Sequence, residues 1–169
     1  MKFQTIITKS LSAISRRVST AAINKTVEIK NQGNDKSSYQ VTTSFHVITV
    51  EIKKELSDLT DKISSVGISY MELQKIEGRV ISFIIDEFEK HKSYLGNTNR
   101  FWQNNKSKFN SFLDDEIDDV TSAFNIRMLV LKQNAKSRRR KALWEIGKMV
   151  LSGIIGGLIT LYLRIKFSP

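Results

Sequence analysis

The sequence predicts an all-α protein of long coiled-coil-like helices, arranged as a hairpin or a stalk, with one C-terminal transmembrane helix. Three observations predict this fold class. The chain has 169 residues with a single proline at the last position, so helices can run without interruption. Apolar residues recur at heptad spacing through the middle of the chain. An uncharged, mostly apolar run of 15 residues, 149–163, lies near the C-terminus.

Residues 1–30 form the basic N-terminal segment, for which the sequence predicts an amphipathic helix. Apolar residues recur at steps of three and four from Phe3 to Val18, and the other positions are mostly Ser, Thr, Lys and Arg. No Asp or Glu occurs before Glu28. This pattern is typical of a mitochondrial transit peptide, cleaved somewhere between residues 17 and 30. The alternative is an amphipathic helix on a bacterial or phage membrane surface.

The middle of the chain divides into a polar linker over 31–44, a heptad helix over 45–95 and a turn over 96–99. The heptad helix rests on six apolar residues spaced by seven: Phe45, Ile52, Leu59, Val66, Leu73 and Val80. In the turn, Gly96 would end one helix and Asn97, Thr98 or Asn99 would cap the next.

A second amphipathic helix is predicted over 100–141. Its apolar residues and those of the heptad helix form the predicted interaction stripe: Ile52, Leu59, Val66, Leu73, Val80, Phe109, Leu113, Ile117, Val120 and Phe124. A lone two-helix hairpin buries little surface. We therefore expect self-association, or another protein, to cover the stripe.

Residues 142–169 are predicted to be a transmembrane anchor with a short tail. The uncharged run alone would reach about 22 Å across a hydrocarbon core of about 30 Å, so basic residues at its ends would have to extend toward water. The basic block over 132–148 predicts that the body lies on the matrix or cytoplasmic side. The predicted span residues, which include small residues suited to helix packing, are Trp144, Lys148, Ser152, Gly153, Gly156, Gly157, Thr160, Tyr162 and Arg164.

The composition offers no recognisable catalytic or metal-binding chemistry. The chain has no Cys, and its two histidines, His46 and His91, are far apart. The acidic run Asp114–Asp119 contains no Gly, so a solvated face is predicted rather than a calcium loop. We expect no enzyme, cofactor, metal or small-molecule substrate. The net charge of +10 is unevenly spread, and it favours membrane lipid over nucleic acid.

Two stretches carry a family resemblance: Leu73–Val80 (LQKIEGRV) followed by Asp86 and Glu87, and Glu116–Val120 (EIDDV) followed by a segment ending in Leu161–Arg164 (LYLR). Together with the order of parts, they resemble the mitochondrial calcium uniporter regulator family of coiled-coil inner-membrane proteins, over roughly residues 70–167. The aromatic stretch Tyr94–Phe112 departs from that family's pattern.

The resemblance implies a scaffold or assembly factor at the mitochondrial inner membrane, with its body in the matrix. The sequence therefore predicts a membrane-anchored helical scaffold that acts through contacts with itself or with other membrane proteins. The alternatives are an accessory subunit of a large respiratory-type membrane complex and a bacterial or phage single-pass membrane effector. In a bacterial inner membrane, the body of the protein would be cytoplasmic.

Overall fold

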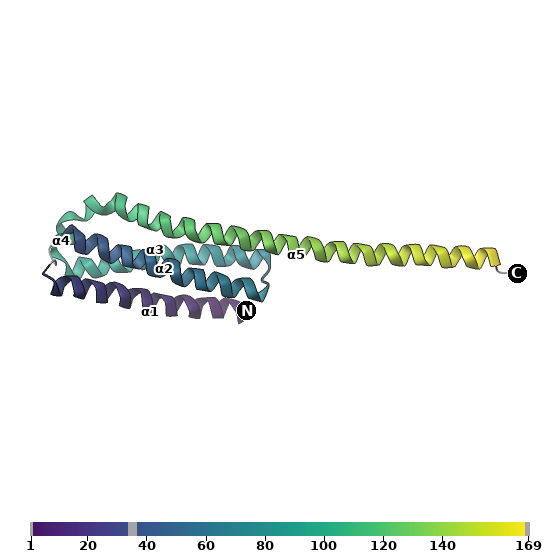
Figure 1. Cartoon of the computed structure of the whole chain (residues 1–169), viewed down its shortest axis with the longest axis horizontal. Helices are drawn as coiled ribbons and strands as arrows, with labels where there is room; N and C mark the ends of the chain where they lie inside the picture. Colours follow the sequence, from purple (N-terminus) through teal and green to yellow (C-terminus); the bar gives the residue numbers. More distant parts are fainter. Residues whose placement is uncertain (1, 34–36, 168–169) are drawn as a thin grey trace.

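The structure, a computed structural model, describes the backbone of residues 2–33 and 37–167 and the side chains of 3–33 and 37–154. Every element within these ranges is helical (Figure 1). The order is α1 (Lys2–Asn31), α2 (Ser38–Val66), α3 (Tyr70–Thr98), α4 (Arg100–Asn105), the 3-10 helix η1 (Lys106–Phe109) and α5 (Asn110–Phe167). The all-α prediction is confirmed for these residues.

The long helices form a four-helix bundle rather than a hairpin or a stalk. α1, α2, α3 and the first half of α5 lie side by side, and successive helices run in opposite directions (Figure 1). α1 packs against α2 and α3, and α5 packs against the same two helices. The short α4 and η1 lead from α3 into α5 at the end of the bundle away from the N-terminus.

The predicted N-terminal amphipathic helix corresponds to α1, and its apolar face lies inside the bundle. Ile7, Leu11, Ile14 and Val18 are between 1% and 9% exposed, and Ile29, near the end of α1, is fully buried. The spacing of apolar residues that suggests a transit peptide is thus also the spacing of a helix that packs into a core. Cleavage after α1 would expose the faces of α2 and α3 that it covers.

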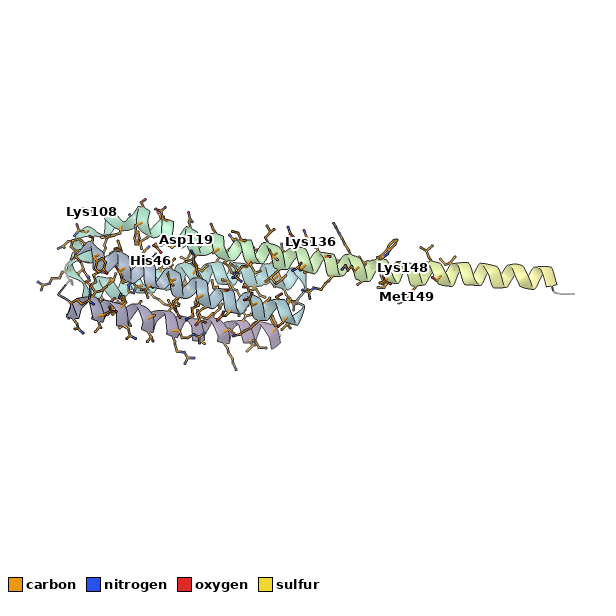
Figure 2. The ribbon with its side chains drawn as sticks, in the orientation of Figure 1. His46, Lys108, Asp119, Lys136, Lys148 and Met149 are labelled. Carbon is orange, nitrogen blue, oxygen red and sulfur yellow. The ribbon has the colours of Figure 1, made fainter. Side chains whose placement is uncertain are left out.

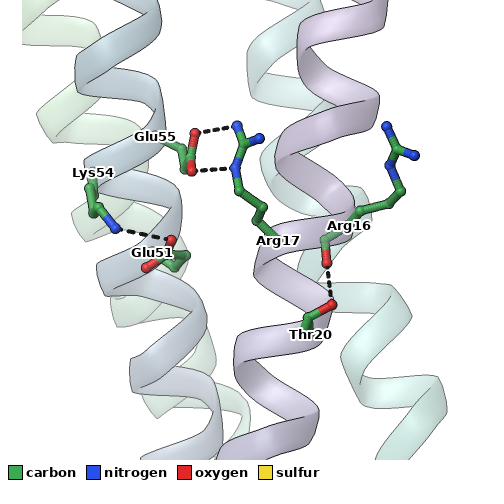
Figure 3. Close-up of polar contacts among 6 residues, drawn as sticks. All are labelled: Arg16, Arg17, Thr20, Glu51, Lys54 and Glu55. Carbon is green, nitrogen blue, oxygen red and sulfur yellow. Dashed lines mark hydrogen bonds and ion pairs between the residues drawn. The ribbon is translucent and has the colours of Figure 1, made fainter.

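A bidentate ion pair joins α1 to α2 (Figure 3). The Arg17 guanidinium donates from Nε to Glu55 Oε1 at 2.5 Å and from Nη2 to Oε2 at 2.6 Å. This hydrogen bonding lowers the pKa of the Glu55 carboxyl and raises that of Arg17. Because Arg17 is half exposed, the pair defines the relative placement of the two helices more than it adds stability.

The predicted single helix over 45–95 is in fact two helices, α2 and α3. α2 ends at Val66, and Gly67 follows in the left-handed conformation with φ of 72°. Ser69 then starts α3 with a capping box: its side chain accepts from the Glu72 backbone amide, and the Glu72 side chain accepts from the Ser69 amide. The heptad spacing continues across this turn, so periodicity alone did not reveal it.

Aromatic side chains fill the end of the bundle beneath α4. The Phe45 ring lies 6.1 Å from Phe88 and 5.6 Å from Trp102, measured between centroids. Asn99 caps α4 by accepting from the Trp102 amide at 2.8 Å. Its buried side chain also donates to Gln40 of α2. The aromatic stretch that departs from the uniporter regulator pattern therefore closes one end of this core.

α5 contains 58 residues, so it is about 87 Å long at about 1.5 Å per residue. Among the side chains of α5 that the structure describes, Ala135 is the last buried one, and the helix then runs on beyond the bundle (Figure 1). The second amphipathic helix predicted over 100–141 thus comprises α4, η1 and the bundled part of α5.

The prediction of a transmembrane helix over 142–169 is contradicted. Within the part of the chain that the structure describes, no helix is long and apolar enough to span a membrane. The uncharged run is short of the thickness of a hydrocarbon core, and Lys148 directly precedes it. The description of the chain as a single-pass membrane protein is corrected with it. The side chains of 155–169 lie outside the described residues.

Candidate interaction site

The predicted interaction stripe lies mainly in the bundle core. Eight of its ten residues are at most 7% exposed: Ile52, Leu59, Leu73, Val80, Phe109, Leu113, Val120 and Phe124. Ile117 is partly buried against the same core, and Val66 is 65% exposed beside the turn between α2 and α3. The stripe therefore holds the helices of one chain together. α1 supplies part of the cover that a partner protein was expected to supply.

Of the predicted span residues, Trp144, Lys148, Ser152 and Gly153 are described, and each is exposed. An added Cβ at Gly153 would meet nothing within 4 Å. The side chains of the other members lie outside the described residues: Gly156, Gly157, Thr160, Tyr162 and Arg164.

The described residues 139–154 of α5, here called the projecting segment, carry an apolar surface that the bundle leaves uncovered. Figure 2 shows Lys148 and Met149 on the part of α5 beyond the other helices. Seven large apolar side chains of this segment are between 56% and 71% exposed: Leu143, Trp144, Ile146, Met149, Val150, Leu151 and Ile154.

A narrow polar strip interrupts this apolar surface. Lys141, Glu145, Lys148 and Ser152 follow one another at steps of three and four, so they share one side of the helix. Lys148 Nζ lies 3.0 Å from the Glu145 carboxylate and 5.5 Å from the centre of the Trp144 ring. The Ser152 hydroxyl donates to the Lys148 carbonyl at 2.8 Å. These contacts pair Glu145, Lys148 and Ser152 within the segment.

The apolar surface is wider than one packing partner requires. At about 100° per residue, the seven apolar side chains extend over roughly 220° of the helix circumference. A helix that packs on a single core commonly presents a stripe of about 100°. At least two neighbouring helices are therefore needed to cover the projecting segment.

The base of the projecting segment is attached to the turn between α2 and α3. Lys136 Nζ lies 4.9 Å from the centre of the Tyr70 ring. An added Cβ at Gly67 would lie 2.9 Å from Arg138 Nη1, so the guanidinium closely approaches this glycine. Arg139, Arg140 and Lys141 follow as an exposed basic group at the start of the segment.

The side of α5 that faces away from the bundle between residues 115 and 140 is here called the outer face. It carries acidic, then apolar, then basic side chains along the helix. Asp115, Asp118 and Asp119 come first, Ile126, Leu129 and Val130 follow, and Lys136 and Arg140 come last, all exposed. Contacts with α2 and α3 hold α5 in this orientation: a hydrogen bond between His46 and Glu116, and the ion pairs Lys53–Asp119, Asp61–Arg127 and Glu77–Lys132. Figure 2 labels Asp119 and Lys136 near the two ends of this face.

A groove of about 790 Å³ lies between α1 and α3, and most of the residues that line it are polar. At its edge, the buried Glu87 carboxylate accepts from Ser15 at 2.7 Å and pairs with Lys90 at 2.6 Å. Arg79 reaches across to Gln4 at 3.0 Å. Among the described residues, no group of three His, Cys, Asp or Glu is placed to hold a metal ion. These polar contacts join α1 to α3 and give the groove a structural role.

Comparison of the chain with protein-family models, curated proteins and solved structures gave no match. The resemblance to the uniporter regulator family thus stays a prediction. The two uncovered surfaces of α5 are the candidate interaction sites among the described residues.

Proposed function

We propose that this protein is a helical scaffold or assembly factor whose bundle is a rigid base and whose projecting segment binds a partner protein. One observation carries this proposal: seven large apolar side chains are exposed on a helix that extends beyond its own bundle. Contiguous apolar surfaces of this kind mark interaction sites in many proteins.

The apolar area is large enough to offset the cost of binding. Full burial of one large apolar side chain contributes about 1.5–3 kcal/mol, and these side chains are 56–71% exposed, so the seven together contribute roughly 6–13 kcal/mol. The costs of association, chiefly lost rigid-body freedom and side-chain ordering, amount to about 4–15 kcal/mol. The gain from burial is of the same order as these costs, so the apolar surface can support a reversible complex.

The surface also defines the chemistry of the partner. A protein with an apolar groove between helices would enclose the wide apolar side and leave the Lys141–Ser152 strip in water. Acidic groups at the rim of the groove would complement Arg139, Arg140 and Lys141. The bundle would set the direction in which the projecting segment enters the groove, through the contacts of Lys136 and Arg138 near the turn.

Photo-crosslinking of the full chain tests the proposal. A crosslinker at Trp144 or Met149 is expected to yield an adduct of one defined mass, mapped to an apolar helical groove and reproduced with the purified partner. The same group at Tyr39, 54% exposed on α2, is the matched control and should give no such adduct.

The Ile146→Glu variant separates binding from folding. Ile146 is 57% exposed, so the variant should have the same melting temperature as the wild-type protein. The crosslinked adduct should disappear. Absence of any protein adduct, or association with phosphatidylcholine–phosphatidylglycerol vesicles in place of a protein, would overturn the proposal.

A further inference from the structure

We infer that a second copy of this chain packs antiparallel along the outer face of α5, forming a two-fold symmetric dimer. This surface shares Arg140 with the projecting segment but none of that segment's seven exposed apolar side chains, so the inference goes beyond the proposed function. It rests on three properties of the outer face: the spacing of its residues, the order of its charges and its exposure.

The spacing places acidic, apolar and basic groups on one side of α5. Residues 115, 122, 126, 129, 133 and 140 follow at steps of seven, four, three, four and seven, so they share a single helix face. The apolar middle is uncovered within the chain, since Ile126 is 66%, Leu129 57% and Val130 51% exposed. An exposed apolar group flanked by opposite charges has the form of an interface.

The order of the charges selects an antiparallel second copy. In two antiparallel helices, opposing residues have numbers with a constant sum. When that sum is 255, four pairs match in charge or chemistry: Asp115 faces Arg140, Asp119 faces Lys136, Ser122 faces Gln133, and Ile126 faces Leu129. Asp119 also pairs with Lys53 of its own chain and Lys136 lies over Tyr70, so the Asp115–Arg140 pair supplies most of the charge complementarity. A parallel pair in register would instead bring Asp115 against Asp115 and Arg140 against Arg140.

Symmetry explains why the occupant is a second copy rather than an unrelated protein. A two-fold axis requires one patch to be complementary to itself. The outer face meets this requirement about a point between residues 127 and 128, where the apolar group lies. Charges opposite one another then fix the register, because a shift by one helix turn would separate them.

The contact is modest in size, which predicts a reversible dimer. Residues 115–140 extend over about 38 Å, and a strip about 10 Å wide would bury roughly 800 Å² in total. Stable complexes commonly bury about 1,200–2,000 Å². Much of the specificity would come from exposed ion pairs, so salt is expected to weaken the dimer.

Dimerisation would give the scaffold two binding elements that point in opposite directions. Ile154 lies 26.5 residues from the two-fold point between residues 127 and 128, along the axis of α5. The two ends at Ile154 would then be about 80 Å apart. Such a dimer would connect two partners.

Cysteine crosslinking of the full chain tests the register directly, because the chain contains no Cys. Ser122→Cys and Gln133→Cys leave every charge in place. Mixed together with a short bis-maleimide, they should form a crosslinked dimer, whereas each alone should not. Leu129→Cys, close to the two-fold axis, should crosslink with itself. Self-crosslinking of Ser122→Cys would indicate a parallel pair, and absence of the mixed product would exclude the dimer; either result overturns the inference.

Charge exchange gives a second, independent measurement by sedimentation equilibrium at low salt. Asp115→Arg alone and Arg140→Asp alone should each weaken the dimer roughly tenfold or more, since each creates two like-charge contacts. The double variant should restore the wild-type affinity. Arg139→Asp makes the same charge change on another side of α5 and should have little effect.

If the double variant did not recover the wild-type dimer affinity, the predicted pairing of Asp115 with Arg140 would be refuted. Ile146→Glu should leave dimerisation unchanged, so loss of the dimer and loss of partner binding remain distinguishable.

Discussion

The buried imidazole of His91 makes the stability of this bundle depend on pH. His91 lies on α3, 6% exposed, with its Nε2 3.0 Å from the Ser44 hydroxyl and its ring edge-on to Phe45 at 4.8 Å. Glu87 lies one turn before His91 on α3 and is paired with Lys90, which directly precedes His91. Tyr94 stacks on the other side of the imidazole. Burial lowers the pKa of His91 from 6.5 to about 4.

The sign of the effect follows from this lowered pKa. Above pH 6.5, the imidazole is neutral in both the folded and the unfolded chain, so the free energy of unfolding does not depend on it. As pH falls below 6.5, the unfolded chain binds a proton that the folded chain excludes, and stability is lost until about pH 4. Between pH 7.5 and pH 5 this amounts to a loss of roughly 2 kcal/mol.

Urea unfolding followed by circular dichroism at several pH values between 5 and 7.5 measures this loss. His91→Phe fills the same space without a titrating group, so its free energy of unfolding should vary much less with pH. His46→Gln is the matched control, because the His46 side chain is 64% exposed, and it should keep most of the pH dependence. If wild type and His91→Phe had the same pH dependence, the argument from burial would be refuted.

Three further changes test how the bundle is held together. Ser69→Ala removes the cap of α3 and should cost about 1 kcal/mol in urea unfolding, whereas Ser65→Ala, on the exposed side of α2, should be nearly neutral. Phe88→Ala leaves a cavity beside Phe45 and should lower the free energy of unfolding by about 3–5 kcal/mol. Ile85→Ala, at a position 45% exposed, is its control, and a similar loss there would argue against the described core. Removal of residues 2–31 should broaden the thermal transition and expose dye-binding apolar surface, while an unchanged transition would show that α1 is dispensable.

Helical content could be predicted from the sequence, because it depends on local properties. The lack of internal proline and the three- and four-residue spacings act within one or two turns. The start of α3 was also visible in principle. Ser69 and Glu72 form the S-x-x-E pattern of a capping box, directly after Gly67. The heptad interpretation passed over this signal, because apolar residues happen to keep a spacing of seven across the turn.

The packing of α1 could not be predicted by the same means. Presequences and core helices both present one apolar face, so a single helix pattern does not separate them. What separates them is distant in sequence: Arg17 meets Glu55 of α2, and Ser15 meets Glu87 of α3. Such contacts exist only once the chain has folded. The stripe therefore predicts a partner from another chain, although α1 of the same chain supplies part of its cover.

Two surfaces among the described residues of α5 are not covered by the rest of the chain. In the bundled part, residues such as Val120 and Met128 are buried, and Ile126 and Leu129 on the other side are not. Beyond Ala135 the bundle ends, and apolar side chains on most sides remain exposed through Ile154. One helix therefore presents two different uncovered surfaces. A narrow face between opposite charges suits a second copy of this chain, and a wide apolar end needs at least two enclosing helices. Each surface can be disrupted by one charged substitution that leaves the other intact, so self-association and partner binding can be measured separately in one full-length protein.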